Sequence, residues 1–412
     1  MRLIHTSDWH LGHVLHDHSR AREHASFLDW LVVQLESTRA DALLVTGDIF
    51  DTANPGAAAQ ATWYGFLARL RRTLPDLHVI VIGGNHDSAL RLDAPRALLD
   101  AHGIHVVGGV PRTADGEIHL DRLVVPIRDA SGRTVARVVA VPFLRPSDLP
   151  SVAGDDPLIA GVRALYAQAI DHARSALQTG EALIVLGHCY MTGTTPSELS
   201  ERRILGGNQH ALPCDLFPED ATYVALGHLH RAQKVTHEHI RYAGSPIPLS
   251  LGEAGYDHQI VQVDIEAGKL VGVTPLRVPR AVDMLRVPVG TGAAGLDAVL
   301  LALRALPPAT DTDREGWPFL EVHVHLPAPE PALRSRVDAA LDGRRARLVK
   351  LTPHYTGTGA TLADAAPTLH LGDLQHEEVL RLCWDRTWER EPSPAVLAAF
   401  GQIVENVLGG DR

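Results

Sequence analysis

Long uncharged apolar segments are missing from this 412-residue sequence. No apolar run approaches the roughly 18 residues that a membrane-spanning helix needs. The opening segment MRLIHTSDWH carries charge from its second residue and lacks the apolar stretch of a signal peptide. Cysteine is also scarce: Cys189, Cys214 and Cys383 are scattered and odd in number, which suits a reducing compartment. The sequence therefore predicts a soluble cytoplasmic protein without a membrane span.

Lysine is almost absent, because Lys234, Lys269 and Lys350 are its only occurrences and arginine supplies nearly all positive charge. The formal net charge is -11, whereas a nucleic-acid-binding domain usually shows a basic footprint. Net charge is a sum over the whole chain and phosphate contacts are local, so this balance does not exclude DNA as a partner. With 45% hydrophobic residues, a chain of this length can bury a sizeable core and is expected to hold more than one domain.

Five short apolar runs end in residues that can bind a metal ion or a phosphate. The third run, HVIVI over residues 78–82, breaks at Gly83-Gly84 and delivers Asn85, His86 and Asp87 in succession. The two glycines allow a sharp turn and a close approach of the backbone to a ligand. The other four runs end in the same manner. The run of residues 2–7 ends at Asp8-Trp9-His10, and the run of residues 42–45 ends at Gly47-Asp48. The run of residues 182–186 ends at Gly187-His188, and that of residues 223–226 ends at Gly227-His228-Leu229-His230.

Helical spacing of apolar residues predicts helices between these runs, over residues 20–38, 57–74, 93–102 and 158–178. Alternation of apolar strands with helices predicts an α/β fold in which a mostly parallel sheet is covered on both faces by helices. Binding sites in such sheets gather at the carboxyl ends of the strands. We therefore expect the five strand ends to form one site.

The strand ends supply imidazole, carboxylate and amide donors without any thiolate, a mixture that suits manganese, iron or zinc. A single tetrahedral ion takes fewer protein ligands than this set contains, so we expect two ions. A shared carboxylate would hold them about 3.5–4 Å apart, and Asp48 is the candidate bridge. His86 is expected to donate a hydrogen bond to a phosphoryl group or leaving oxygen, with Asp51 or Asp87 orienting it. The predicted metal ligands are Asp8, His10, Asp48, Asn85, His188, His228 and His230.

Each of these motifs also has a purely structural explanation when it is taken alone. Gly47-Asp48 is a common turn, and Gly-His-Leu-His is compatible with a loop that binds nothing. The chain has 24 histidines, so a single one is seldom a ligand. The occurrence of five clusters, one at the end of each predicted strand, is what favours a metal centre.

The series DWHLG, GDIFD, GNHD, GH and GHLH resembles the calcineurin-like metallophosphoesterase superfamily. More narrowly, HTSDWHLG, FLDWL, GDIFDT, GNHDS, VALGHLHRAQ and RYAGSPIPLS resemble the SbcD family, the nuclease subunits of bacterial SbcCD complexes. The resemblance covers residues 1–280 strongly and the remainder by layout only. It implies an α/β fold with a β-sandwich core flanked by helices, a small α+β capping domain and C-terminal helices.

The resemblance also implies a division of the site residues. Asp8, His10 and His230 would hold one Mn²⁺, Asn85, His188 and His228 the other, and Asp48 would bridge them. His86 would be the catalytic histidine. Family members cut DNA ends as ATP-independent exonucleases and nick single strands as endonucleases, so DNA ends and hairpins are the implied substrates.

The C-terminal third is expected to form two further parts. Residues 281–355 show a β-α-β-α-β pattern, and the resemblance implies a capping domain over the DNA groove. In it, residues 321–326 alternate as a half-solvated strand would, which explains His323 and His325 better than a metal pair does. Its most basic cluster is Arg344, Arg345, Arg347 and Lys350. These residues either contact phosphate groups of DNA or form a solvated surface.

Residues 356–370 are rich in glycine, threonine and alanine and are expected to be a linker, and residues 371–412 are expected to form two helices. The resemblance implies that these helices bind the coiled coil of an SbcC-like ATPase. It further implies a homodimer, within a heterotetramer, formed through residues 57–72 and 91–102. Two alternatives remain open: a metallophosphoesterase that acts on small phosphoesters, and a DNA-end tether that binds without cutting.

Overall fold

The structure is a computed structural model that describes residues 1–152, 156–197 and 211–355, together with scattered positions between residues 380 and 400. The chain forms two compact units. One contains residues 1–325 and 331–354, and the other contains residues 326–330 and 355–412. No helix within the described ranges is long and apolar enough to cross a membrane.

The first of two six-stranded sheets begins with the N-terminal strand and has the order β14-β13-β1-β4-β5-β6. Four neighbouring strands are parallel, and the pair β13–β14 closes one edge in antiparallel register. The parallel strands are almost fully buried, as their apolar composition predicts. The bounds are β1 Arg2–Thr6, β4 Ala42–Thr46, β5 His78–Ile82, β6 Ile104–Val107, β13 Gln259–Glu266 and β14 Lys269–Arg277.

The second sheet has the order β11-β12-β10-β9-β8-β7. Its four central strands are again parallel, and an antiparallel strand lies at each edge. The bounds are β7 Val124–Arg128, β8 Thr134–Ala140, β9 Ala182–His188, β10 Tyr223–Gly227, β11 Gln233–Val235 and β12 His237–Tyr242.

The two sheets pack face to face, because one hydrophobic cluster takes side chains such as Leu44 and Ile80 from the first sheet and Val138 and Ile184 from the second. The metallophosphoesterase-type sandwich is thereby confirmed, and the single sheet expected from strand–helix alternation is wrong. Each sheet has helices on its outer face and the other sheet on its inner face. Local apolar composition is the same in both situations, so it cannot distinguish them.

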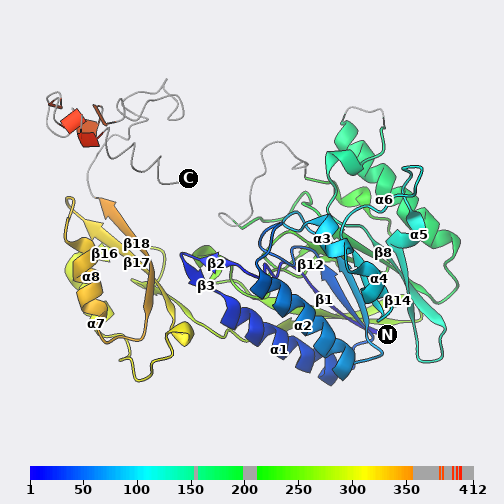
Figure 1. The fold of residues 1–412 in the computed structure, drawn as a ribbon, viewed down its shortest axis with the longest axis horizontal. Coiled ribbons are helices and arrows are strands. Elements are labelled where there is room, and N and C mark those ends of the chain that lie inside the picture. Colours follow the sequence, from blue (N-terminus) through cyan, green and yellow to red (C-terminus); the bar gives the residue numbers. More distant parts are fainter. Residues whose placement is uncertain are drawn as a thin grey trace. The chain divides into compact units, whose positions relative to one another are not determined.

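Helices α1 and α2 cover the outer face of the first sheet, where Phe27, Leu31, Trp63 and Phe66 pack against β1, β4 and β5. The two helices lie side by side, and α6 packs on the second sheet (Figure 1). At the start of α6, the Asp156 carboxylate accepts the backbone N–H groups of Leu158 and Ile159. The helix bounds are α1 Ala21–Thr38, α2 Ala57–Thr73, α3 Ala89–Asp93, α4 Arg96–Asp100, α5 Leu120–Leu123 and α6 Pro157–Ser175.

The helix expected over residues 93–102 is wrong in its bounds, because two short helices, α3 and α4, replace it. Pro95 lies between them as the N-cap of α4. Proline has no backbone N–H to donate to the preceding turn, so the helical hydrogen bonds are interrupted at this point.

Residues 281–355 contain the expected strands and helices. Strands β15, β16 and β18 pair with β17, and α7 packs on α8. The half-solvated strand expected at residues 321–326 is wrong, since β17 is buried almost throughout. Glu321 accommodates this burial by pairing with Lys350 at 3.1 Å and with His323 at 3.0 Å. The bounds are β15 Met284–Val287, β16 Ala294–Gly295, α7 Leu296–Arg304, β17 Phe319–Leu326, α8 Leu333–Leu341 and β18 Arg347–Tyr355, besides the hairpin of β2 Val14–Leu15 and β3 His18–Ser19 near the N-terminus.

The linker expected over residues 356–370 lies outside the described residues, as does most of the helical segment expected over residues 371–412. At one described position, the backbone N–H groups of Val396 and Leu397 donate to the carbonyl of Ser393.

Candidate metal centre

The structure brings the seven predicted ligands together at the carboxyl ends of five strands. Asp8 and His10 follow β1, Asp48 follows β4 and Asn85 follows β5, all in the first sheet. His188 ends β9, and His228 and His230 follow β10, both in the second sheet. The site therefore lies where the ends of the two sheets meet.

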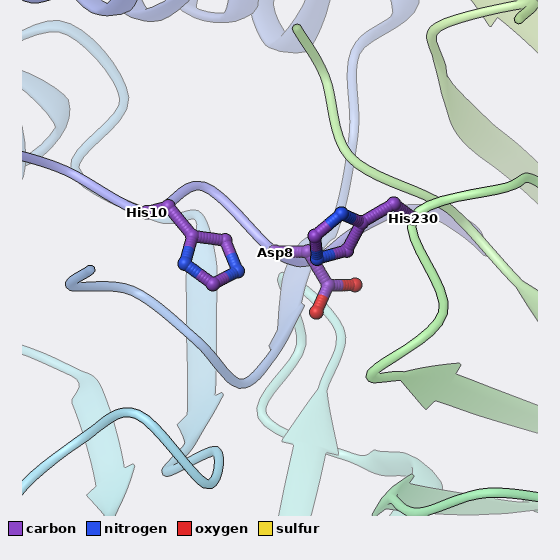
Figure 2. Close-up of side chains that lie close together, drawn as sticks. All are labelled: Asp8, His10 and His230. Carbon is purple, nitrogen blue, oxygen red and sulfur yellow. The ribbon is translucent and has the colours of Figure 1, made fainter. Parts of the chain in front are cut away.

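The first group of side chains consists of Asp8, His10 and His230, whose potential ligand atoms lie within 4.8 Å of one another. Figure 2 shows the three side chains gathered in one place, His10 from the loop after β1 and His230 from the loop after β10. All three are buried, and the Nε2 atom of His10 has no hydrogen-bond partner. We call these residues the Asp8 group.

The second group, the Asn85 group, consists of Asn85, His188 and His228. The Oδ1 atom of Asn85 lies 2.9 Å from Nε2 of His188 and 3.0 Å from Nδ1 of His228. Three donor atoms from three strand ends thus converge on one point.

Asp48 lies between the two groups. Its Oδ2 atom is 3.6 Å from Nε2 of His10 and 3.5 Å from Nε2 of His188. Its other oxygen, Oδ1, accepts the backbone N–H of His86 at 2.8 Å. One carboxylate can therefore face both groups at once, as a bridging ligand would.

His86 lies beside the Asp8 group, with its ring centroid 4.8 Å from that of His10. Its Nδ1 atom bonds the backbone carbonyl of Asp51 at 2.7 Å, so Nδ1 carries the proton and Nε2 remains for other contacts. His86, Asn85 and His228 are partly exposed, whereas the other predicted site residues are buried. The centre therefore opens to solvent beside His86.

Asp51 orients His86 through its backbone carbonyl, as expected, whereas the carboxylates of Asp51 and Asp87 have other partners. The Asp51 carboxylate lies 3.3 Å from Nδ1 of His10 and 2.9 Å from Nδ1 of His13. Although burial works in the opposite direction, these two histidines lower the pKa of Asp51. Asp87 instead accepts the backbone N–H groups of Gly84, Ile49 and Phe50, which holds the loops after β4 and β5 together.

The backbone around the centre is strained. Asp8, His10, Asp48 and His228 all have positive φ angles, of 54°, 48°, 50° and 106°. Non-glycine residues adopt such angles rarely, and they concentrate at functional sites. A side chain at Gly84 would collide with the Oδ1 atom and the backbone of Asp48, so only glycine allows the two loops to approach so closely.

Charge and burial prepare the centre for a cation. Burial lowers the pKa of His10, which favours the neutral form that a metal requires. Burial would also lower the pKa of His188, but the adjacent Asp48 carboxylate raises it to about 9. The same buried negative charge of Asp48 that raises this pKa would attract a metal cation.

The donor set fits a divalent ion. It contains imidazole nitrogens, carboxylate oxygens and an amide oxygen, which together suit borderline metals. The buried Nε2 atom of His10 without a partner is a second sign, because buried polar atoms normally have one.

Sequence analysis missed Glu253, which lies in a short 3-10 turn, Leu251–Glu253. Its carboxylate bonds Nδ1 of His230 at 2.9 Å and is fully buried. It also missed His13, which lies between Asp51 and the carbonyl of Leu249. Neither residue is at a strand end. The only signal was their position shortly after the motifs HTSDWHLG and GSPIPLS.

The arginines of the predicted basic cluster have partners inside the structure. Arg344 donates to the carbonyl of Leu306, Arg345 to that of Gly316, and Arg347 to those of Trp317 and Glu315. These guanidinium groups therefore hold the segment of residues 306–317, and they leave fewer donors for phosphate than the sequence suggests.

Comparisons with known proteins cover most of the chain. A sequence model of the calcineurin-like phosphoesterase family matches residues 1–232, and one described as the type 5 capsule protein repressor C-terminal domain matches residues 280–387. The SbcD subunit of the nuclease SbcCD from Rhodobacter capsulatus is 42% identical over 361 residues, which cover 85% of this chain and 87% of that protein. The SbcD protein of Escherichia coli K12 is 37% identical over 293 residues, 68% of each chain. That of Bacillus subtilis is 37% identical over 277 residues, 65% of this chain and 67% of the relative.

Proposed function

Because the chain belongs to the SbcD family of calcineurin-like phosphoesterases, and is thereby a metal-dependent phosphodiesterase, we propose that it is a Mn²⁺-dependent DNA nuclease. It acts as a double-strand exonuclease and a single-strand endonuclease on DNA ends and hairpins. One observation carries the proposal: Asp48 lies within 3.6 Å of a histidine from each of two convergent ligand groups.

The Asp8 group holds one ion, the Asn85 group holds the other, and Asp48 is shared between them. Two ions bound in this way would bind a phosphoryl oxygen, acidify the attacking water and stabilise the charge of an in-line displacement. The chain itself contributes fixed geometry. Backbone N–H groups held by Asp87 and the strained ligand positions keep the donor atoms in place before a substrate arrives.

His86 is the catalytic histidine in this proposal. The Asp51 carbonyl accepts a hydrogen bond from Nδ1 and orients the ring, which leaves Nε2 for the substrate. A protonated Nε2 donates a hydrogen bond to the phosphoryl group or to the departing oxygen.

The remaining parts of the chain govern access and assembly. Residues 1–280 form the nuclease domain, residues 281–355 the capping domain that restricts which DNA reaches the centre, residues 356–370 a linker, and residues 371–412 the helices that bind an SbcC-like coiled-coil ATPase. The names of the relatives, which identify them as one component of a nuclease called SbcCD, support such a partner. Two copies of each chain form a heterotetramer in the cytoplasm, where thiols such as Cys189 and Cys214 stay reduced.

The decisive experiment measures cleavage and metal content on the same sample. Purified protein, alone and with its partner ATPase, is given linear duplex, hairpin and single-stranded DNA with Mn²⁺, beside p-nitrophenyl phosphate and cyclic nucleotides. We expect cleavage of DNA with at most slow turnover of the small substrates. Two bound Mn²⁺ without DNA cleavage would contradict the proposal, and fast small-substrate turnover in that case would favour a small phosphoesterase. Full biological function of an Asp48→Asn variant would favour a DNA-end tether.

A further inference from the structure

The histidines of the two ligand groups are held by different kinds of partner. In the Asp8 group, Nδ1 of His230 bonds Oε1 of Glu253 at 2.9 Å, and Glu253 is 0% exposed. The other oxygen of Glu253 accepts the backbone N–H of Leu249 at 2.8 Å, which fixes the carboxylate in place. Because Glu253 engages Nδ1, His230 would bind the ion through Nε2.

His10, the second histidine of the Asp8 group, also has a carboxylate behind it. Its Nδ1 atom lies 3.3 Å from Oδ1 of Asp51. Two carboxylates, from two different loops, therefore support the two histidines of this group.

In the Asn85 group, His188 is held by a backbone carbonyl instead of a carboxylate. Nδ1 of His188 donates to the backbone carbonyl of Thr46 at 2.8 Å. Asn85 contributes an uncharged amide oxygen in the place where the Asp8 group has the carboxylate of Asp8. Asp48 is common to both groups, so it does not create a difference between them.

The segment of residues 245–253, which contains most of the GSPIPLS motif, connects the supports of the Asp8 group. The backbone N–H of Ser245 donates to the carbonyl of His230 at 3.0 Å, and the segment ends at Glu253. Its Leu249 carbonyl bonds His13, which in turn bonds Asp51. The segment thus reaches both histidines of one group.

We propose that Glu253 is a positioning residue which strengthens the Asp8 group, so that the two ions bind with unequal affinity and the Asp8 group fills first. This inference rests on the proposed two-ion centre. A carboxylate on Nδ1 fixes the imidazole tautomer, makes Nε2 a better donor and adds buried negative charge near the cation. Loss of such a partner typically weakens metal binding by about 10–100-fold.

The test is a Glu253→Gln variant of the full chain. If the glutamine oxygen accepts the hydrogen bond from Nδ1 of His230, the glutamine NH2 group faces the backbone N–H of Leu249. Two donors then oppose each other and the bond to Leu249 is lost. If the amide turns round, it donates to Nδ1 of His230 and forces the ring proton onto Nε2, which then cannot bind an ion. Either orientation loses one function of the carboxylate.

The measurement is titration of metal-free protein with Mn²⁺, followed by calorimetry and by the paramagnetic resonance signal of free Mn²⁺. For the unaltered protein we expect one tight and one weaker ion. Glu253→Gln should weaken the tight ion about 10–100-fold and change the weaker one by less. The control is Glu321→Gln, which also alters a buried carboxylate but contacts Lys350 and His323 rather than a predicted ligand, and should leave both affinities unchanged.

Thermal unfolding in a chelator establishes whether Glu253→Gln is folded. If it is not, Asp51→Asn provides the same test through His10, and it too should weaken the tight ion. Two equal ions in the unaltered protein, or an unchanged tight ion in the folded variant, would overturn the inference and leave the nuclease proposal intact. Absence of Mn²⁺ binding in the unaltered protein would overturn both.

Discussion

Among the histidines of the centre, His86 alone combines an Nδ1 bond to a backbone carbonyl, that of Asp51, with a partly exposed side chain. We predict that His86→Ala keeps both ions, since the Asp8 and Asn85 groups and Asp48 remain. Cleavage should fall by about 10²–10⁴-fold, as expected for loss of a proton donor in the transition state. The measurement is kcat/KM on duplex DNA, with bound Mn²⁺ counted on the same sample.

Loss of an ion in His86→Ala would contradict this assignment and make His86 a ligand. A matched control is His237→Ala, because His237 is an exposed histidine of β12 outside the centre and outside the expected dimer contact. Its cleavage rate should equal that of the unaltered chain.

Single residues at strand ends could be predicted because the chemistry is local. Asn85, for example, follows a run of apolar residues and two glycines, and its position in the site needs no further knowledge of the fold. The partners of the histidines could not be predicted. Glu253 lies 23 residues after His230, and only the path of the intervening chain brings the two together. Of the two residues expected to orient His86, Asp51 does so through its backbone carbonyl, whereas the Asp87 carboxylate bonds backbone amides of another loop.

At the scale of elements, the loops after β4 and β5 touch through a glycine. We predict that Gly84→Ala lowers stability and Mn²⁺ affinity together, because the new Cβ atom would collide with the backbone N and the carboxylate of Asp48. Overpacking of this kind typically costs about 1–3 kcal/mol, and here it also displaces the proposed bridging ligand. Denaturant unfolding and Mn²⁺ titration measure the two effects.

Gly65→Ala is the control for this substitution. Gly65 is exposed in α2, and a Cβ atom there would meet nothing within 4 Å. Alanine should stabilise the helix by about 0.5–1 kcal/mol and leave Mn²⁺ affinity unchanged. Equal behaviour of the two variants would show that the approach of Gly84 to Asp48 is unimportant.

Most elements could be predicted from periodicity, but their assembly into sheets could not. The helices Ala21–Thr38 and Ala57–Thr73 lie close to their expected ranges. The strands β4 and β9 have the same buried apolar composition, and one belongs to each sheet. Strand pairing depends on contacts between distant segments. A local sequence pattern therefore predicts that a strand forms but not which strand it pairs with.

At the scale of the whole molecule, two buried histidines link stability to pH. Burial lowers the pKa of His5 to about 3 and that of His24 to about 3. Between pH 6.5 and pH 3 the unfolded chain binds these protons and the folded chain does not, so stability falls as pH falls. Each histidine should remove about 2 kcal/mol of unfolding free energy between pH 7 and pH 5.

Denaturant unfolding at several pH values, with a chelator present to exclude metal effects, measures this loss. His24→Gln is the matched variant, because a glutamine amide can still donate to the carbonyl of Trp9, which His24 bonds at 2.8 Å. It should reduce the loss between pH 7 and pH 5 by about 2 kcal/mol, the share of one histidine. A free energy of unfolding that is equal at pH 5 and pH 7 would contradict the prediction.

The proposed homodimer is the last property of the whole molecule that the structure makes testable. Leu98 on α4 is 64% exposed and lies within the range of residues 91–102 that the family resemblance implies for the contact. Leu90 on α3 is 85% exposed and directly precedes that range. Burying a leucine is worth about 1.5–3 kcal/mol, and a two-fold interface contains each residue twice. We therefore predict that Leu98→Glu weakens dimerisation by at least about 10²-fold, measured by analytical ultracentrifugation of the full chain. Leu301→Glu, at a 69% exposed leucine of α7, should leave the dimer intact, and a strictly monomeric unaltered protein at high concentration would contradict the proposed assembly.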